Sequence, residues 1–201
     1  MSRVVCHQST SLDGYSAGPD QSLEHPMGTG EVRRLHQWMF RADEPGHGAD
    51  AAWRADLLRP IGAVVMGRNM FGPVRGGWPD ESWRGWWGEE PPYHAPVFVL
   101  THHERAPLET TGTTFHFVTG GFDEAFARAR EAAGDQDVRI AGGASTVRQA
   151  LAAGVVDELR LDIAPFLLGA GERLFDGVSG FGLDPVEVVH SPLATHVRYA
   201  R

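Results

Sequence analysis

Short apolar runs rich in β-branched residues alternate along the chain with longer segments in which apolar residues recur every three or four positions. The short runs are typical of strands and the longer segments of helices, so the alternation predicts an α/β domain with a largely parallel sheet. We expect strands at residues 3–8, 63–66, 96–101, 114–118, 138–141 and 158–163. We expect helices at residues 31–42, 123–133 and 145–153.

The C-terminal part of the chain has the pattern of a β-hairpin. Residues 186–190 and 195–199 are rich in strand-forming residues, and the four residues between them include Pro192. Two short strands joined by such a turn form an antiparallel pair. The hairpin would close one edge of the sheet and make the sheet mixed.

Two stretches, residues 18–30 and 72–96, show neither pattern and are expected to be irregular. The second carries four tryptophans among its prolines and glycines, two of which are Trp78 and Trp86. These side chains could cover a planar substrate or a subunit contact, and Trp78 and Trp86 are the expected substrate-binding residues. Local packing that orders the loop is the alternative.

Length and charge limit what the chain can be. Its 201 residues with 42% hydrophobic content fit one domain over residues 1–201. A formal charge of −8 disfavours nucleic acid as a partner, because that binding depends on neutralising phosphates. No apolar run approaches the ~20 residues of a membrane helix. The first residues lack a signal-peptide pattern, so we expect no membrane partner and a cytoplasmic location.

Three residue types narrow the chemistry. The single cysteine, Cys6, has apolar neighbours, which predict a buried strand residue and not a nucleophile. The chain has no lysine, so Schiff-base and lysine general-base chemistry are excluded. The ten histidines show no H-E-x-x-H spacing, which predicts solvated or hydrogen-bonded histidines and no metal.

The most informative local pattern is a strand that runs into a glycine pair and then a helix, at residues 138–146. Without Cβ atoms, Gly142 and Gly143 would let the backbone approach a ligand. The N–H groups at the helix start and the hydroxyls of Ser145 and Thr146 could receive phosphate oxygens. The alternative is a tight turn with Ser145 as N-cap, because the segment is neither G-x-G-x-x-G nor a Walker sequence.

Two further strand ends carry residues suited to phosphate. Gly67, Arg68 and Asn69 follow the second expected strand, and a guanidinium there can pair with the 2′-phosphate that distinguishes NADPH from NADH. Thr101 and His102 follow the third. Since ligands gather at the carboxyl ends of strands in an open α/β sheet, these ends together outline a nucleotide site. Taken alone, Arg68 could equally be a solvated loop residue.

Two acidic residues have competing interpretations. Asp13, two residues after Ser11, could hydrogen-bond a heterocycle or supply the proton that hydride transfer to C=N or C=O needs. The Asp-Gly pair at 13–14 is also ideal for a turn, which the residues alone favour. Asp162 lies in an alternating apolar–polar segment, so it need not be functional.

In order, the chain contains Ser-Leu-Asp-Gly at 11–14, Val-Met-Gly-Arg at 65–68, Val-Phe-Val-Leu-Thr at 97–101, Gly-Gly at 142–143, Leu151, Val-Asp-Glu-Leu at 156–159 and Pro-Phe-Leu-Leu-Gly-Ala-Gly at 165–171. This ordered set resembles the dihydrofolate-reductase-like superfamily. The resemblance is closest to the reductase domain of the bifunctional riboflavin-biosynthesis deaminase-reductase and its stand-alone relatives. It extends from about Val4 to the C-terminal hairpin.

The resemblance implies a three-layer α/β/α sandwich, NADPH as hydride donor, a heterocyclic substrate, frequent homodimers and no metal. The nearest named activity is 5-amino-6-(5-phosphoribosylamino)uracil reductase. Asp13 would face the nicotinamide and the substrate as the catalytic residue, with Ser11 as a substrate-binding residue. The residues implied in cofactor binding are Gly67, Arg68, Asn69, Thr101, His102, Gly142, Gly143, Ala144, Ser145 and Thr146.

The chain also departs from that family. A lysine commonly lies four residues before the serine of S-L-D-G, where this chain has His7. The phosphoribosyl-binding D-x-P loop is replaced by residues 70–75, and the acidic residue expected on the first helix of a folate reductase is missing from residues 33–41. Two alternatives therefore stay open: a nucleotide-binding scaffold without catalysis, and a dihydrofolate reductase.

A third alternative is an NAD-linked Rossmann enzyme. It would need an acidic ribose ligand after Gly142, and Asp162 has suitable spacing. Asp162 lies within a strand and not at its end, and Arg68 favours NADPH over NADH.

Overall fold

A nine-stranded sheet forms the centre of the computed structural model, which describes residues 2–72, 76–78 and 80–201. Its strands are β1 (Val4–Ser11), β3 (Ala63–Gly67), β4 (Val97–Leu100), β5 (Leu108–Thr110), β6 (Thr113–Val118), β7 (Val138–Gly142), β8 (Glu158–Ala164), β10 (Asp184–His190) and β11 (Thr195–Ala200). Their order across the sheet is β10-β11-β8-β1-β7-β3-β4-β6-β5. A small second sheet pairs β2 (Tyr15–Ala17) with β9 (Glu172–Arg173).

The sheet is mixed and mostly parallel, as the sequence predicts. Neighbouring strands from β8 through β1, β7, β3 and β4 to β6 are parallel. The C-terminal hairpin of β10 and β11 is antiparallel, with Val188 opposite Val197, and β11 continues antiparallel onto β8. The six strands expected outside the hairpin are confirmed. The short strands β2, β5 and β9 were not predicted, because two or three residues are too few to show a period.

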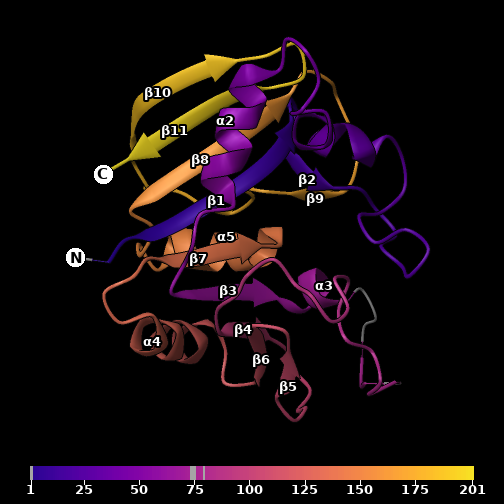
Figure 1. Cartoon of the computed structure of the whole chain (residues 1–201), viewed down its shortest axis with the longest axis vertical. Helices are drawn as coiled ribbons and strands as arrows, with labels where there is room; N and C mark the ends of the chain where they lie inside the picture. The colour runs from indigo at the N-terminus through magenta and orange to yellow at the C-terminus, as the bar shows by residue number, and fades with distance from the viewer. Residues whose placement is uncertain (1, 73–75, 79) are drawn as a thin grey trace.

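Helices cover both faces of the sheet and give the three-layer α/β/α sandwich (Figure 1). α4 (Phe122–Ala133) and α5 (Ala144–Ala152) pack on one face, against β3, β4 and β7. The 3₁₀ helix η1 (Val32–His36), α1 (Gln37–Phe40) and α2 (Gly48–Leu57) lie on the other, near β1, β8 and β10. The short α3 (Arg68–Phe71) directly follows β3. Within the described residues, no helix has the length and apolar content needed to cross a membrane.

The single helix expected at residues 31–42 is wrong. The segment forms η1 and then the four-residue α1, and neither start has a side-chain cap. Packing of the buried side chains Leu35 and Trp38 holds these short turns in place. α2 was not predicted. Its buried positions are Asp50 and Trp53, and the pattern of apolar residues in the sequence does not identify a buried carboxylate as a core position.

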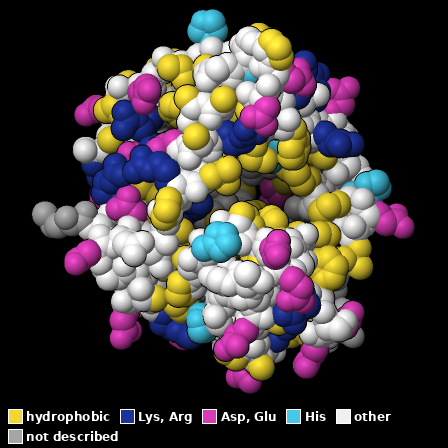
Figure 2. Space-filling view, in the orientation of Figure 1, with side chains coloured by type: hydrophobic (Ala, Val, Ile, Leu, Met, Phe, Trp, Pro, Cys, Tyr) yellow, Lys and Arg dark blue, Asp and Glu magenta, His cyan; other side chains and the backbone are white. Residues whose placement is uncertain are grey.

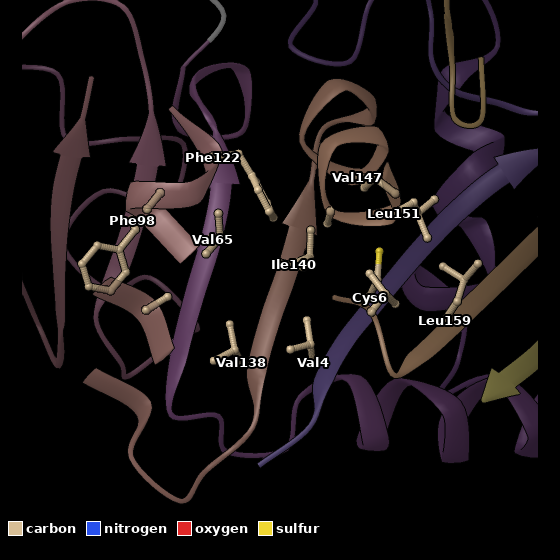
Figure 3. Packing of buried hydrophobic residues seen from close by; sticks show 14 of the residues in the cluster. Val4, Cys6, Val65, Phe98, Phe122, Val138, Ile140, Val147, Leu151 and Leu159 are labelled. Atoms are coloured by element: carbon tan, nitrogen blue, oxygen red, sulfur yellow. The ribbon is translucent and has the colours of Figure 1, made fainter. Parts of the chain in front are cut away.

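The core between the sheet and helices α4 and α5 follows the strand period of two. Val4 and Cys6 of β1, Val65 of β3 and Ile140 of β7 contribute buried side chains to this face (Figure 3). Burying an aliphatic side chain of this kind stabilises the fold by roughly 1.5–3 kcal/mol. Cys6 is a buried strand residue as predicted, and burial raises the pKa of its thiol to about 12, which keeps the thiol unreactive.

The segments expected to be irregular contain no helix or strand at residues 18–30, 76–78 and 80–96. Residues 73–75, part of the stretch that replaces the D-x-P loop, and residue 79 lie outside the described residues. Of the residues that replace that loop, the structure therefore describes only 70–72, at the end of α3.

Candidate active site

A cavity of about 1130 Å³ lies at the carboxyl ends of the parallel strands. Ser9 of β1, Gly67 of β3, Thr101 after β4, Gly143 after β7 and Asp162 of β8 all line it. Figure 2 shows a hollow near the middle of the molecule, bordered by hydrophobic side chains. The volume exceeds the roughly 300–1,000 Å³ typical of a small-molecule site, so the cavity has room for a dinucleotide beside a small substrate.

Nine of the ten residues expected to bind the cofactor line this cavity: Gly67, Arg68, Asn69, Thr101, His102, Gly143, Ala144, Ser145 and Thr146. Gly142 is not among the lining residues. Its φ of +115° favours glycine, and a Cβ there would lie 3.1 Å from Oε1 of Gln8. The structure thus gathers at one edge of the sheet three strand ends that are far apart in the sequence.

The turn between β7 and α5 is open towards the cavity. Gly143 caps α5 through its backbone, so the alternative role of Ser145 as N-cap is wrong: Ser145 lies inside the first turn. A Cβ on Gly143 would meet no atom within 4 Å, which leaves space for a ligand oxygen beside the chain. The first N–H groups of a helix have no intrahelical acceptor and carry partial positive charge. This helix start can therefore hold a diphosphate.

The close approach of β3 to α5 requires glycine at position 67. A Cβ on Gly67 would lie 2.7 Å from Oγ1 of Thr146, which is shorter than any ordinary contact. Thr146 is itself buried, so its side chain has little space to move away. The bare backbone of Gly67 therefore brings the first residues of α3 next to the start of α5.

Arg68, the first residue of α3, holds its guanidinium over the ring of Trp78, with Cζ 3.9 Å from the ring centroid. It donates hydrogen bonds to the carbonyl oxygens of Gly76 and Gly77. Burial, followed by the charge of Arg105, lowers the pKa of Arg68, and no carboxylate of the described residues neutralises it. Arg105 also lies over Trp78, at 4.9 Å. Two arginines beside one ring favour an anion such as a phosphate.

The two tryptophans expected to bind substrate have different surroundings. Trp86 lines the cavity, and its Nε1 donates to the carbonyl of Asn69 at 3.3 Å. Trp78 does not line the cavity: it packs edge-on against Phe71 and Phe117 and donates to the carbonyl of His103 at 3.0 Å. These contacts agree with the loop-ordering alternative, and contact of Trp78 with a substrate stays a prediction.

Ser11 and Asp13 are also absent from the cavity lining. The carboxylate of Asp13 accepts hydrogen bonds from Ser11 Oγ at 2.5 Å, Leu168 N at 3.0 Å and Gly169 N at 2.8 Å. The bond from Ser11 lowers the pKa of Asp13 to about 2. At neutral pH the carboxylate of Asp13 is ionised and accepts three hydrogen bonds. This arrangement is typical of a turn, and an ionised carboxylate has no proton to donate. Contact of Asp13 with a substrate stays a prediction.

Sequence reasoning missed the polar residues on the face covered by η1, α1 and α2. His7, Ser9 and Asp162 line the cavity there, and Asp162 accepts hydrogen bonds from both His7 Nε2 (2.9 Å) and Ser9 Oγ (3.1 Å). Burial acts to raise the pKa of Asp162, but its histidine partners lower it to about 2. The alternation in β8 predicts a polar face but cannot show that α2 buries it. The signal available was His7, at the position where related reductases commonly have lysine.

This fold defines an α/β domain with a cavity of nucleotide size at the carboxyl edge of its sheet. The sequence model of the RibD C-terminal domain family matches residues 2–190. The chain therefore belongs to this family, which is a family of reductases. No curated protein matches the chain.

Solved structures with the same fold have low sequence identity to the chain. A putative riboflavin biosynthesis protein from Shewanella sp. PV-4 is 24% identical, with TM-score 0.66 over 99% of this chain and 98% of that one. A dihydrofolate reductase from Enterococcus faecalis, complexed with NADP(H), is 14% identical, with TM-score 0.54 over 99% and 96%. The diaminohydroxyphosphoribosylaminopyrimidine deaminase/5-amino-6-(5-phosphoribosylamino)uracil reductase of Thermotoga maritima is 15% identical, with TM-score 0.58 over 99% of this chain and 56% of that one.

Proposed function

We propose that the protein is an NADPH-dependent reductase that transfers a hydride to a heterocyclic small molecule. The nearest named activity is 5-amino-6-(5-phosphoribosylamino)uracil reductase. The observation that carries the proposal is the shared cavity of Gly67, Arg68 and the start of α5, where glycine backbone, unneutralised cation and helix N–H groups meet. The family membership and the NADP(H) complex of the enterococcal structure support it.

The residues fit a dinucleotide phosphate in three places. Gly143 leaves open space beside the helix start, so residues 144–146 would hold the diphosphate. Arg68, whose buried Nε has no partner among the described residues, would hold the 2′-phosphate. Thr101 and His102 would lie near the adenosine ribose. When bound, NADPH supplies the hydride, and the chain has to orient the nicotinamide and exclude water.

The substrate would occupy the part of the cavity lined by Ser9, His36, Trp38 and Trp86. Two indole rings provide apolar surface for a planar heterocycle, and the serine and histidine provide polar contacts at its edge. The Thermotoga relative is named for a phosphoribosylamino substrate. A phosphate-free heterocycle therefore has to be compared directly with its phosphoribosyl form.

The test is a pair of assays on the purified chain. NADPH and NADH are first titrated in thermal unfolding, where a ligand at 100 times its Kd stabilises the folded state by about 2.7 kcal/mol. NADPH oxidation is then followed with 5-amino-6-(5-phosphoribosylamino)uracil, its dephosphorylated form and dihydrofolate. Selective stabilisation by NADPH together with turnover supports the proposal. Stabilisation without turnover of any of the three indicates a nucleotide-binding scaffold, and no stabilisation rejects the cofactor.

We also propose a homodimer in the cytoplasm. The edge strand β10 exposes Val186 and Val188 to 50% and 62%, and exposed apolar side chains on an unpaired edge favour association. Light scattering at several concentrations tests this. A mass near 21.9 kDa at all of them would exclude the dimer.

A further inference from the structure

A row of alternating histidine and aspartate side chains connects the start of α2 to the cavity. Nδ1 of His47 lies 2.7 Å from Oδ2 of Asp50, and Oδ1 of Asp50 lies 2.9 Å from Nε2 of His196. Nδ1 of His196 lies 2.8 Å from Oδ1 of Asp162, and Oδ2 of Asp162 lies 2.9 Å from Nε2 of His7. His7 and Asp162 line the cavity, whereas His47, which is itself buried, lies directly before α2.

The centre of the row is charged although it is buried. A neutral imidazole has one N–H and cannot donate to two carboxylates, so His196 between Asp50 and Asp162 is an imidazolium. Burial acts to lower the pKa of His196, but the hydrogen bonds to Asp162 and Asp50 raise it above the ordinary value. Buried ion pairs stabilise a fold little more than well-packed apolar side chains do. A gain in folding stability therefore does not explain why these charged side chains are buried together.

His7 has the geometry of a proton donor at the end of the row. Nε2 of His7 lies 2.9 Å from Oδ2 of Asp162, and the indole N–H of Trp53 points at the same nitrogen at 3.2 Å. One nitrogen cannot donate to a carboxylate and accept from an indole N–H at once, so the shorter, charge-assisted contact assigns the Nε2 proton to the bond with Asp162. As an imidazolium, His7 donates Nε2–H to Asp162 and keeps Nδ1–H for another acceptor. After losing the Nδ1 proton it remains bound to Asp162. No described residue forms a hydrogen bond with Nδ1, and the ring lies within 6.0 Å of the ring of Trp38, another cavity residue.

The other titratable groups near His7 have different tasks. His36 of η1 also lines the cavity, but burial lowers its pKa to about 4, so it is neutral at physiological pH and accepts or donates only as a neutral ring. Arg160, opposite His7 in the register of β8, forms ion pairs with Glu158 and Asp56. Among the described histidines that line the cavity, only His7 forms a hydrogen bond with a carboxylate.

We propose that His7 is the catalytic proton donor of the reduction, and that Asp162, His196, Asp50 and Trp53 are positioning residues that hold its ring. This rests on the proposed function. The electrophilic carbon of the substrate C=N or C=O takes the hydride, and its heteroatom takes the proton from Nδ1 of His7, which becomes neutral. After the product leaves, a proton from water in the cavity returns to Nδ1 of His7. Each turnover consumes one NADPH and one proton.

The kinetic test uses the full chain with NADPH and 5-amino-6-(5-phosphoribosylamino)uracil. His7→Gln keeps a polar side chain but no titrating group, so we expect kcat to fall about 10²- to 10⁴-fold with an unchanged KM for NADPH. The wild-type kcat should depend on pH, whereas the kcat of the variant should not. Added imidazole restores part of the rate. Wild-type kcat and pH profile in His7→Gln would overturn the proposal.

Asp50→Asn and Trp53→Phe test the positioning role, because neither side chain lines the cavity. Both should shift the pH profile of kcat while leaving the KM for NADPH unchanged. His116→Gln on β6, stacked on Phe98 away from the row, is the matched control and should keep the wild-type profile. A loss of thermal stability without any change in pH profile would limit Asp50 to a structural role and overturn its role in positioning His7.

A second readout separates this proposal from the proposed function. Nitrogen-15 spectra of the histidine rings in the NADPH-free chain should show His196 protonated on both nitrogens at neutral pH. The ring-nitrogen resonances of His7 should move in Asp50→Asn. If the aminouracil is not reduced but the His7 resonances respond to Asp50→Asn, the named substrate fails and the positioning of His7 by the row stands. If the His7 resonances are identical in both proteins, the positioning role fails whatever the substrate is.

Discussion

The carboxylate of Asp13 accepts a hydrogen bond from the backbone N–H of Gly169 at 2.8 Å, across 156 residues of sequence. Leu168 N donates to the same carboxylate, and Leu174 N bonds to the carbonyl of Gly14. The turn after β1 and the segment after β8 are therefore joined through one side chain. Two motifs that are separate in the sequence, at 11–14 and 165–171, are parts of one structural unit.

Asp13→Asn should make the folding stability of the protein in acid less dependent on pH. Because the Ser11 hydrogen bond lowers the pKa of Asp13 from 3.8 to about 2, its ionised form stabilises the fold above about pH 4, and this contribution is lost as pH falls through about 2. We expect a steeper decrease of Tm between pH 4 and pH 2 in the wild type than in the variant, measured by circular dichroism. A variant with wild-type Tm at every pH and no turnover would instead support the catalytic role expected from the resemblance.

Gly67→Ala should weaken both the fold and the cofactor site. The added methyl group would lie 2.7 Å from Thr146 Oγ1, and inserting a group into a packed contact costs about 1–3 kcal/mol. Urea unfolding should show that loss, and calorimetry should show weaker NADPH binding as α5 moves from α3. Gly182→Ala is the matched control, since a Cβ there meets no atom within 4 Å. Equal stability of the two variants would show that the Thr146 side chain moves away from the added methyl group without an energetic cost.

Arg68→Ala should reduce affinity for NADPH far more than for NADH. A charge-assisted hydrogen bond contributes ~1.5–3 kcal/mol, which corresponds to about a ten- to hundredfold change in Kd. Calorimetric titration with both cofactors checks this. Arg33→Ala, an exposed arginine outside the cavity, controls for the loss of one positive charge. Equal losses for NADPH and NADH would assign Arg68 to ordering the loop through Gly77 and Trp78.

Most of the sheet could be predicted because its strands show their period locally. The cofactor side of the cavity could be predicted for the same reason: Gly67, Arg68 and Gly143 directly follow strands, and parallel strands bring their carboxyl ends together. The histidine–aspartate row could not be predicted. Its members come from β1, α2, β8 and β11, and a polar residue in a sequence does not reveal whether tertiary packing buries it.

Disrupting the buried row should also change how stability depends on pH. His196 has a raised pKa, so its protonated form stabilises the fold fully below pH 6.5, and the contribution is lost as pH rises through the higher pKa of the folded state. His36, whose pKa is lowered to about 4, has the opposite effect, but only between about pH 4 and 6.5.

Urea unfolding between pH 6.5 and about 8 therefore isolates the contribution of His196, because the raised pKa of Cys6 changes stability only at higher pH. The wild type should lose stability with rising pH in this range, whereas His196→Asn should show a weaker dependence and a loss of roughly 3–5 kcal/mol at pH 6.5, because Asp50 and Asp162 keep buried charges without their shared partner. His190→Asn, on the exposed strand β10, is the control and should behave as the wild type. A pH-independent wild-type stability above pH 6.5 would mean that His196 is neutral in the folded protein.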